Sequence, residues 1–416
     1  MILPCRIRGC RNHVPPLRFA LLFAACLLAP IGEAKAQGTE ASAPEEAGVS
    51  WFPAVPLRIT AGVDLGYDDH VIGSNATTGA SGQGSFSMRE NLFLSYDRPV
   101  GPTEVHLIGV GRFTQFLDVG ADDKDVNLTL GVTHNFSTRL SFRADLYASY
   151  QTEPNFQSNV GPENVRAPHF NTIDIFSLSY HWLPRVSTIT SLTFDAVKYE
   201  QTTPTTTTIG TAQDRVQYGL GEQLQFSLTR RTNLIGDYRF QIVDYGTAPN
   251  NSVTHSVSAG FTHNLTEHLR INVLAGESFR SQENGGDSMS PNAQTLVTYS
   301  GSNYSLSWTT RYGFEQSTVQ NASSSITFRT GLNLQYHITS RIGARASVFY
   351  NNAENQNVTS SGTSAAGSQG ALQFTLGLNY TINKNFAAHI DFEHSSSGGQ
   401  GSYSRNSYFA GLTYTY

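Results

Sequence analysis

The stretch that decides the fold is residues 126–150, VNLTLGVTHNFSTRLSFRADLYASY. In its first half, from Val126 to Phe136, every second residue is apolar apart from one histidine, and from Leu140 to Tyr150 the alternation starts again. A period of two places successive side chains on opposite faces of a β-strand. The stretch therefore predicts two antiparallel strands, each with an apolar face and a polar face, joined by a short turn.

The connections between strands distinguish a membrane barrel from a soluble sheet, because both kinds of sheet show this alternation. Tight connections repeat one pattern: an apolar or aromatic residue, a short Ser, Thr or Asn turn with a basic residue, then the next strand. They occupy residues 135–140, 228–232, 264–269, 338–342 and 382–386. Longer polar connections occupy residues 151–171, 201–214, 281–292 and 352–370. Short turns at one end and long loops at the other are typical of outer-membrane barrels.

The predicted fold is all-β: a closed antiparallel transmembrane β-barrel with short periplasmic turns and long extracellular loops. Counting alternating segments from Leu57 to Tyr416 gives about 18 strands, and weak alternation at 103–118 and 292–300 could shift the count by two. Barrels of this size leave an aqueous channel. Aromatic residues near strand ends predict girdles at the membrane interfaces, as at Tyr150, Tyr180, Trp182, Tyr336 and Tyr380.

The two ends of the chain predict export to the outer membrane. Residues 1–36 combine four arginines, an apolar run and the small-residue site Ala34-Lys35-Ala36, which indicates a signal peptide. Residues 37–56 contain several prolines and no periodicity, which favours a periplasmic lead-in, and residues 57–416 form the barrel. The last strand ends at the aromatic Tyr416, similar to the terminal signal that the barrel-assembly machinery recognises. We therefore expect that machinery and outer-membrane lipid as partners.

Cysteine positions and charge exclude several classes of function. Cys5, Cys10 and Cys26 all lie in the predicted signal peptide, so disulfides, thiolate metal sites and cysteine nucleophiles are not expected in the exported chain. The whole chain has 27 Lys and Arg against 32 Asp and Glu; residues 1–36 hold five of the bases and one of the acids, which leaves a net charge of −9. This acidic balance disfavours nucleic acid as a partner.

Charged residues recur on the predicted polar face, where they would line the lumen. Such charges can select solutes, or they can pair with one another and stiffen the wall; the sequence leaves both readings open. The lumen-lining candidates are Arg58, Asp64, Arg112, Arg143, Asp145, Asp237, Arg239, Arg270, Arg311, Glu315, Arg329, Arg345 and Asp391.

Three glutamates, Glu90, Glu222 and Glu277, fall on the predicted apolar face. A carboxylate is costly near the membrane midplane. A β-bulge or a local register error is therefore the favoured explanation, ahead of a binding role.

Catalytic and metal motifs are weak. His389 and Asp391 share one face of a strand, and Asp68, Asp69 and His70 stand where the first strand meets its loop, but short Asp and His pairs arise readily at such places. The run Asp122, Asp123 and Asp125 lacks the glycine and distal glutamate of a calcium loop, so a solvated acidic turn is expected. We expect no enzyme activity, no cofactor and no metal.

The first predicted strand ends in Tyr67, Asp68, Asp69 and His70. It resembles the first strand of a β-barrel porin family associated with exopolysaccharide loci, in which that strand ends in Tyr-Asp-Asp-Asn; here His70 replaces the final Asn. In motif the resemblance covers this strand alone. It implies an outer-membrane conduit or accessory for polysaccharide export.

The function favoured by the sequence is a non-enzymatic channel for hydrophilic solutes in a bacterial outer membrane, with a polysaccharide or small polar solutes as partners. A surface adhesin or structural barrel is one alternative, and a membrane-embedded hydrolase is another. The transported solute, the openness of the pore and the oligomeric state stay open.

Overall fold

The computed structural model describes residues 56–71, 83–119, 121–152, 168–200, 214–246, 251–283, 286–315, 324–356, 368–398 and 403–416. The predicted signal peptide, nearly all of the predicted lead-in and most of the predicted long loops lie outside these residues. No helix in the described part of the chain is long and apolar enough to cross a membrane.

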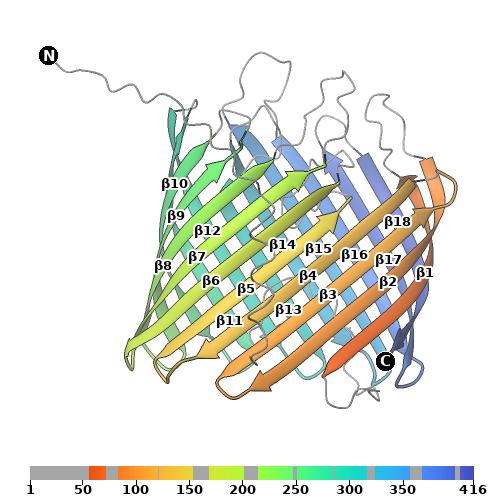
Figure 1. Ribbon diagram of the computed structural model, residues 1–416, viewed down its shortest axis with the longest axis horizontal. Coiled ribbons are helices and arrows are strands. Elements are labelled where there is room, and N and C mark those ends of the chain that lie inside the picture. The colour runs from red at the N-terminus through yellow and green to blue at the C-terminus, as the bar shows by residue number, and fades with distance from the viewer. Residues whose placement is uncertain are drawn as a thin grey trace, which may run out of the picture.

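The described residues form a single closed barrel of 18 antiparallel strands, as predicted (Figure 1). Each strand pairs with its neighbours in sequence, and β1 pairs with β18 to close the ring. The strands are β1 (Leu57–Val71), β2 (Gln83–Val100), β3 (Thr103–Phe116), β4 (Ala121–Asn135), β5 (Leu140–Gln151), β6 (His169–Leu183), β7 (Val186–Tyr199), β8 (Arg215–Ser227), β9 (Thr232–Asp244), β10 (Ser252–Asn264), β11 (Leu269–Gln282), β12 (Gly286–Ser300), β13 (Tyr304–Glu315), β14 (Ser324–His337), β15 (Ile342–Gln356), β16 (Ser368–Thr381), β17 (Phe386–Gly398) and β18 (Tyr403–Thr415).

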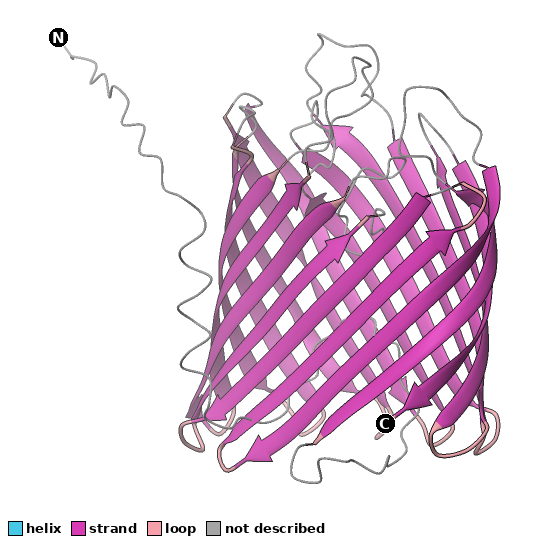
Figure 2. Cartoon of the chain, turned by 45° about the vertical axis from the view of Figure 1, so that its right-hand side comes forward, coloured by secondary structure: helices cyan, strands magenta, loops and turns pink. Residues whose placement is uncertain are grey.

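The tight turns gather at one end of the barrel (Figure 2). Their repeated Ser, Thr or Asn has a structural reason, because its side-chain oxygen accepts hydrogen bonds from the backbone two and three residues further on. Thr266 accepts from His268 and Leu269, and Asn383 accepts from Asn385 and Phe386. The start of β1 and the end of β18 lie at this same end, so the even strand count brings both ends of the barrel to the short-turn side.

Two predicted loops are wrong. Residues 286–292 were expected in a long connection but belong to β12, which pairs with β11 down to Gly286–Gln282. Pro291 hides this strand in the sequence because proline cannot donate to a sheet ladder. Residues 122–125 were expected as an acidic turn but lie at the beginning of β4.

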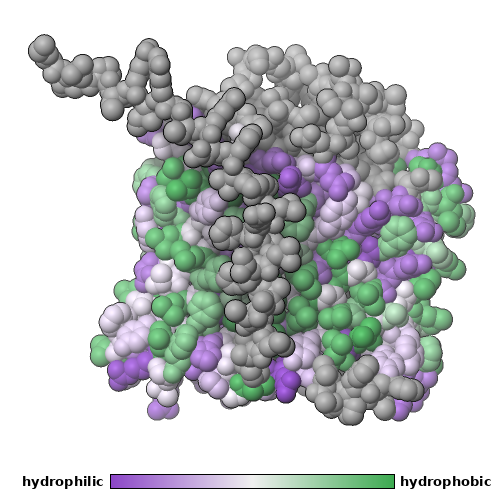
Figure 3. All heavy atoms as spheres, in the orientation of Figure 1, coloured by the Kyte–Doolittle hydropathy of each residue, from purple (hydrophilic) through white to green (hydrophobic). Residues whose placement is uncertain are grey.

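Large apolar side chains are exposed at alternate positions of most strands, and Figure 3 shows apolar patches on one side of the outer face. On β1, Val63 is 51% exposed and Leu65 is 66% exposed, whereas Asp64 between them is 2% exposed on the opposite face. Aromatic pairs stand beside the tight turns, such as Tyr180 with Trp182 and Phe386 with Tyr414. A soluble barrel would hide these side chains, whereas a barrel in a bilayer presents them to lipid.

Candidate functional site: the polar lumen wall

The inner face of the barrel carries mainly charged, hydroxyl and amide side chains, interrupted by buried apolar ones such as Ile235, Leu274 and Phe409. All thirteen charged positions proposed for the lumen lie opposite the apolar face, because the register of the sheet gives each the opposite parity to the outward positions of its strand. Their exposure varies widely. The side chains of Arg311 and Arg345 are 55% and 47% exposed, whereas Arg329 is 10% exposed.

Several of these charges pair along one strand or between neighbouring strands. The Arg143 guanidinium donates to both carboxylate oxygens of Asp145, at 2.6 and 3.0 Å. Arg239 Nε lies 2.9 Å from Asp237 Oδ2. Residues two apart on a strand share a face, so these pairs follow directly from sequence spacing.

Glu315 brings two arginines together near the end of β13. Its carboxylate lies 2.5 Å from Arg329 and 4.0 Å from Arg311. Because Arg329 is nearly buried and lies closer to the carboxylate than Arg311 does, Glu315 interacts mainly with Arg329. Arg311 is left extending into the lumen with more than half of its side chain exposed.

A second network crosses the closing seam. Asp391 lies 2.7 Å from Arg345 and 3.8 Å from His389, and His389 Nε2 lies 3.0 Å from Asp64 on β1. Asn91 on β2 donates to the other oxygen of Asp64 at 2.8 Å. The His389–Asp64 contact passes over β18 at Gly411, where a Cβ atom would overlap the Asp64 carboxylate. The predicted His389 and Asp391 pair is thus part of a network that links β15, β17, β1 and β2.

The Tyr-Asp-Asp motif also lies at this seam. Asp68 is fully buried on the inner face and accepts hydrogen bonds from Arg405 Nε (2.6 Å) and Ser407 Oγ (2.9 Å) of β18. Asp69 points to the opposite face and accepts two bonds from Asn406, one from its backbone and one from its amide. The two acids therefore join β1 to β18 from both sides of the wall. Tyr67 packs edge-on against Phe86 on the outer face, and the backbone of His70 donates to Asp68.

The bulges predicted at the three outward glutamates are absent. In the pairings of β2 and β11 with their neighbours, and of β8 with β7 and β9, the register runs unbroken through Glu90, Glu277 and Glu222. The carboxylates therefore do face outward. Thr190 donates to Glu222 at 2.6 Å on that face, and nothing in the structure explains Glu90 and Glu277.

The structure also shows charged residues that the sequence-based selection omitted. Asp174 faces outward between Leu146 and Phe194. Arg89, Arg215, Arg280 and Arg405 lie on the inner face, and the same two-residue period would have placed them there. Asp125 lies in β4, where it accepts a bond from Asn127, and the described residues contain no group of three or more His, Cys, Asp or Glu that could hold a metal ion.

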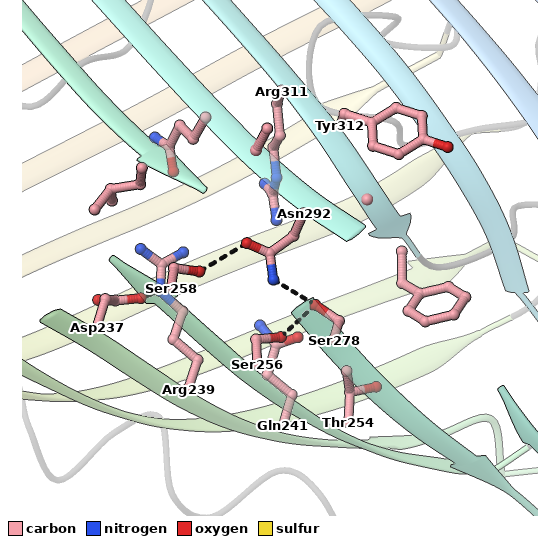
Figure 4. Close-up of a pocket in the computed structure, with 15 residues that line it drawn as sticks. Asp237, Arg239, Gln241, Thr254, Ser256, Ser258, Ser278, Asn292, Arg311 and Tyr312 are labelled. Carbon is pink, nitrogen blue, oxygen red and sulfur yellow. Dashed lines mark hydrogen bonds and ion pairs between the residues drawn. The ribbon is translucent and has the colours of Figure 1, made fainter. Parts of the chain in front are cut away.

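The inner wall is hollowed where β9 to β13 meet (Figure 4). The hollow is small, with a volume of about 60 Å³, it opens to the lumen, and its lining is predominantly polar. We call it the β9–β13 niche. Its lining includes Asp237, Arg239, Gln241, Thr254, Ser256, Ser258, Leu274, Ser278, Asn292, Gln294 and Arg311.

No family model and no curated protein matches the sequence. Among solved structures, the outer-membrane protein OpdK of Pseudomonas aeruginosa aligns with a TM-score of 0.41 and 10% identity over 86% of this chain and 99% of its own. OccK9 (OpdG) of the same organism aligns with a TM-score of 0.43 and 9% identity over 88% and 100%. OccK2 (OpdF) of that organism, solved with glucuronate, aligns with a TM-score of 0.43 and 9% identity over 87% and 98%.

The location follows from the barrel itself. A closed ring leaves no strand edge for lipid to meet, its outer face is apolar and its inner face is polar. Among spanning structures, only closed barrels satisfy every backbone group of a β-sheet inside a bilayer. The chain is a transmembrane β-barrel of the bacterial outer membrane.

Proposed function

We propose that this barrel is a non-enzymatic channel for hydrophilic solutes. The observation that carries the proposal is the exposure of lumen arginines that are already in ion pairs: 47% for Arg345 beside Asp391 and 41% for Arg239 beside Asp237. A wall whose charges only stiffened it would bury them. Charges that remain exposed on an inner face stand in contact with water and can act on passing solutes.

Conductance through a planar bilayer tests this proposal. Protein purified from outer membranes is expected to give stable channels whose conductance depends on lumen width. Gly343 and Gly236 make a matched pair, because a Cβ atom added at either meets nothing within 4 Å, yet Gly343 faces the lumen and Gly236 faces outward. Gly343→Trp is expected to lower single-channel conductance, and Gly236→Trp is expected to leave it unchanged.

Two outcomes would contradict the channel. A correctly folded barrel that never conducts would remove it and favour a surface or structural barrel. Equal effects of the two tryptophans would mean that current does not pass through the lumen.

A narrower role in exopolysaccharide export is supported only by the resemblance of Tyr67, Asp68, Asp69 and His70. In the structure the two acids of this motif bond to neighbouring strands of the same chain. These contacts within the barrel account for the two acids without a bound polysaccharide. The polar lumen therefore supports a channel for small solutes better than a role in polysaccharide export.

A further inference from the structure

Several short side chains line the β9–β13 niche, and two glycines lie on the neighbouring part of the wall. Gly260 and Gly276 face inward on β10 and β11, and a Cβ atom on either would overlap a backbone carbonyl oxygen of the facing strand. Ser256, Ser258 and Ser278 lie on the same face, and their short side chains leave the inner surface recessed there rather than filled.

Hydroxyl and amide groups form an ordered chain across this recess (Figure 4). Ser258 Oγ donates to Asn292 Oδ1 at 2.7 Å, and Asn292 Nδ2 donates to Ser278 Oγ at 2.9 Å. Ser256 and Ser278 share a bond of 2.8 Å. A hydroxyl offers one donor and two acceptor positions and an amide nitrogen two donors, so these groups keep hydrogen-bonding capacity beyond the chain.

Two guanidinium groups stand at the niche with much of their surface exposed. Arg239 is 41% exposed and uses Nε for Asp237, while Arg311 is 55% exposed and lies 4.0 Å from Glu315, its ion-pair partner among the described residues. A guanidinium presents parallel N–H groups that match the two oxygens of a carboxylate.

A third arginine nearby, Arg280, is buried and forms hydrogen bonds within the barrel wall. The ladder between β12 and β13 ends at Ala293–Tyr312, just before Pro291 and Gly313. Beyond the last pair of this ladder, Arg280 donates to the backbone oxygen of Glu315 at 3.1 Å and lies over the ring of Phe314; its side chain is 1% exposed. Arg280 thus replaces a missing ladder bond, and the cations of the niche are Arg239 and Arg311.

We propose that the β9–β13 niche binds a small polyhydroxylated solute bearing a single carboxylate, with the carboxylate on Arg311 and hydroxyls on the Ser256, Ser278 and Asn292 chain. This inference rests on the proposed channel and names its solute class. The recess lies at the side of the lumen, so a bound solute remains in contact with the aqueous path.

The test compares three probes at equal concentration: a hexuronate, the matching neutral hexose and acetate. Binding is measured twice, as block of single-channel current and by titration calorimetry on the detergent-purified protein. The hexuronate is expected to bind at least tenfold more tightly than either of the others, because only it meets both the guanidinium and the hydroxyl chain.

Variants locate the site. Arg311→Gln is expected to weaken hexuronate binding about tenfold, as loss of a charge-assisted bidentate bond does. Arg311→Lys keeps the charge but loses the fork, so it is expected to restore only part of that loss. The control is Arg112→Gln: Arg112 is 43% exposed and lies 3.8 Å from Asp125 on the other side of the lumen, and its loss is expected to leave hexuronate binding unchanged.

The outcomes separate the two proposals. Channels that conduct but bind hexuronate no better than acetate, or lose binding equally in both glutamine variants, would overturn the niche and leave the channel standing. A barrel that does not conduct, yet binds hexuronate through Arg311 in calorimetry, would overturn the channel and retain the site.

Discussion

Two glycines at inward positions of adjacent strands leave no room for a side chain. At Gly260 and Gly276 a methyl group would overlap the carbonyl oxygens of Val273 and Val257. Rearranging two paired backbones to admit it is expected to cost at least about 3 kcal/mol, the upper end of overpacking in a rigid core. Gly260→Ala and Gly276→Ala should therefore lower the yield of folded barrel, seen as loss of the heat-dependent mobility shift in a detergent gel.

The control is Gly343→Ala, which also faces the lumen but meets nothing within 4 Å. It is expected to fold like the unaltered chain. If all three alanine variants fold equally well, the close approach of β10 and β11 is not a requirement of the fold.

Residue by residue, the sequence predicts which face a side chain occupies better than which partner it meets. The two-residue period places Asp64 and His389 on the inner face, because that parity is local. Their contact depends on the order of β17, β18 and β1 and on the missing side chain of Gly411. Such long-range register leaves no local pattern. Outward acids such as Glu222 show the converse: the period was right, and the inferred bulge was wrong.

Among the elements, the turns were the most predictable and β12 the least. The tight turns carry their signal in three or four adjacent residues, of which one bonds the backbone within the turn. The first half of β12 contains Pro291 and mostly polar residues, so neither alternation nor composition marks it as a strand. This half pairs with β11 but not with β13. Where β12 and β13 no longer pair, Arg280 of β11 donates a hydrogen bond to Glu315 of β13. No pattern along β12 or β13 reveals this contact.

That role of Arg280 is testable at the level of the strand pair. Arg280→Met keeps much of the side-chain volume but removes the donor to Glu315 and the bond from Nε to Thr254. Leaving buried acceptors without their donor costs about 1 to 3 kcal/mol each. Amide exchange is expected to rise in peptides covering the ends of β12 and β13, with little change on the far side of the ring.

Arg270→Met on the same strand supplies the comparison, since Arg270 faces the lumen near the tight turns and is exposed. Equal exchange at β12 and β13 in both variants would show that Arg280 does not secure this part of the wall.

On the scale of the whole molecule, the barrel depends on one pairing that joins the two ends of the strand sequence. Asp68 and Asp69 bond β18 from the inner and outer face, and His389 reaches Asp64 across β18. Every other strand pair is joined by a turn or loop in the chain, whereas β1 and β18 meet only through noncovalent contacts. The seam is thus where side-chain bonds contribute most to closure.

Asp68→Ala tests this. Removing one partner of a buried ion pair costs about 3–5 kcal/mol, and here the pair is nearly inaccessible, at 0% exposure for Asp68 and 11% for Arg405. The matched change Asp145→Ala breaks the more exposed pair with Arg143 within a wall already joined by turns, and is expected to cost about 1 kcal/mol or less. Urea unfolding followed by tryptophan fluorescence measures both, and amide exchange in β1 and β18 shows where the wall opens. A loss for Asp68→Ala no larger than that for Asp145→Ala, with unchanged exchange in β1 and β18, would mean that backbone pairing alone closes the barrel.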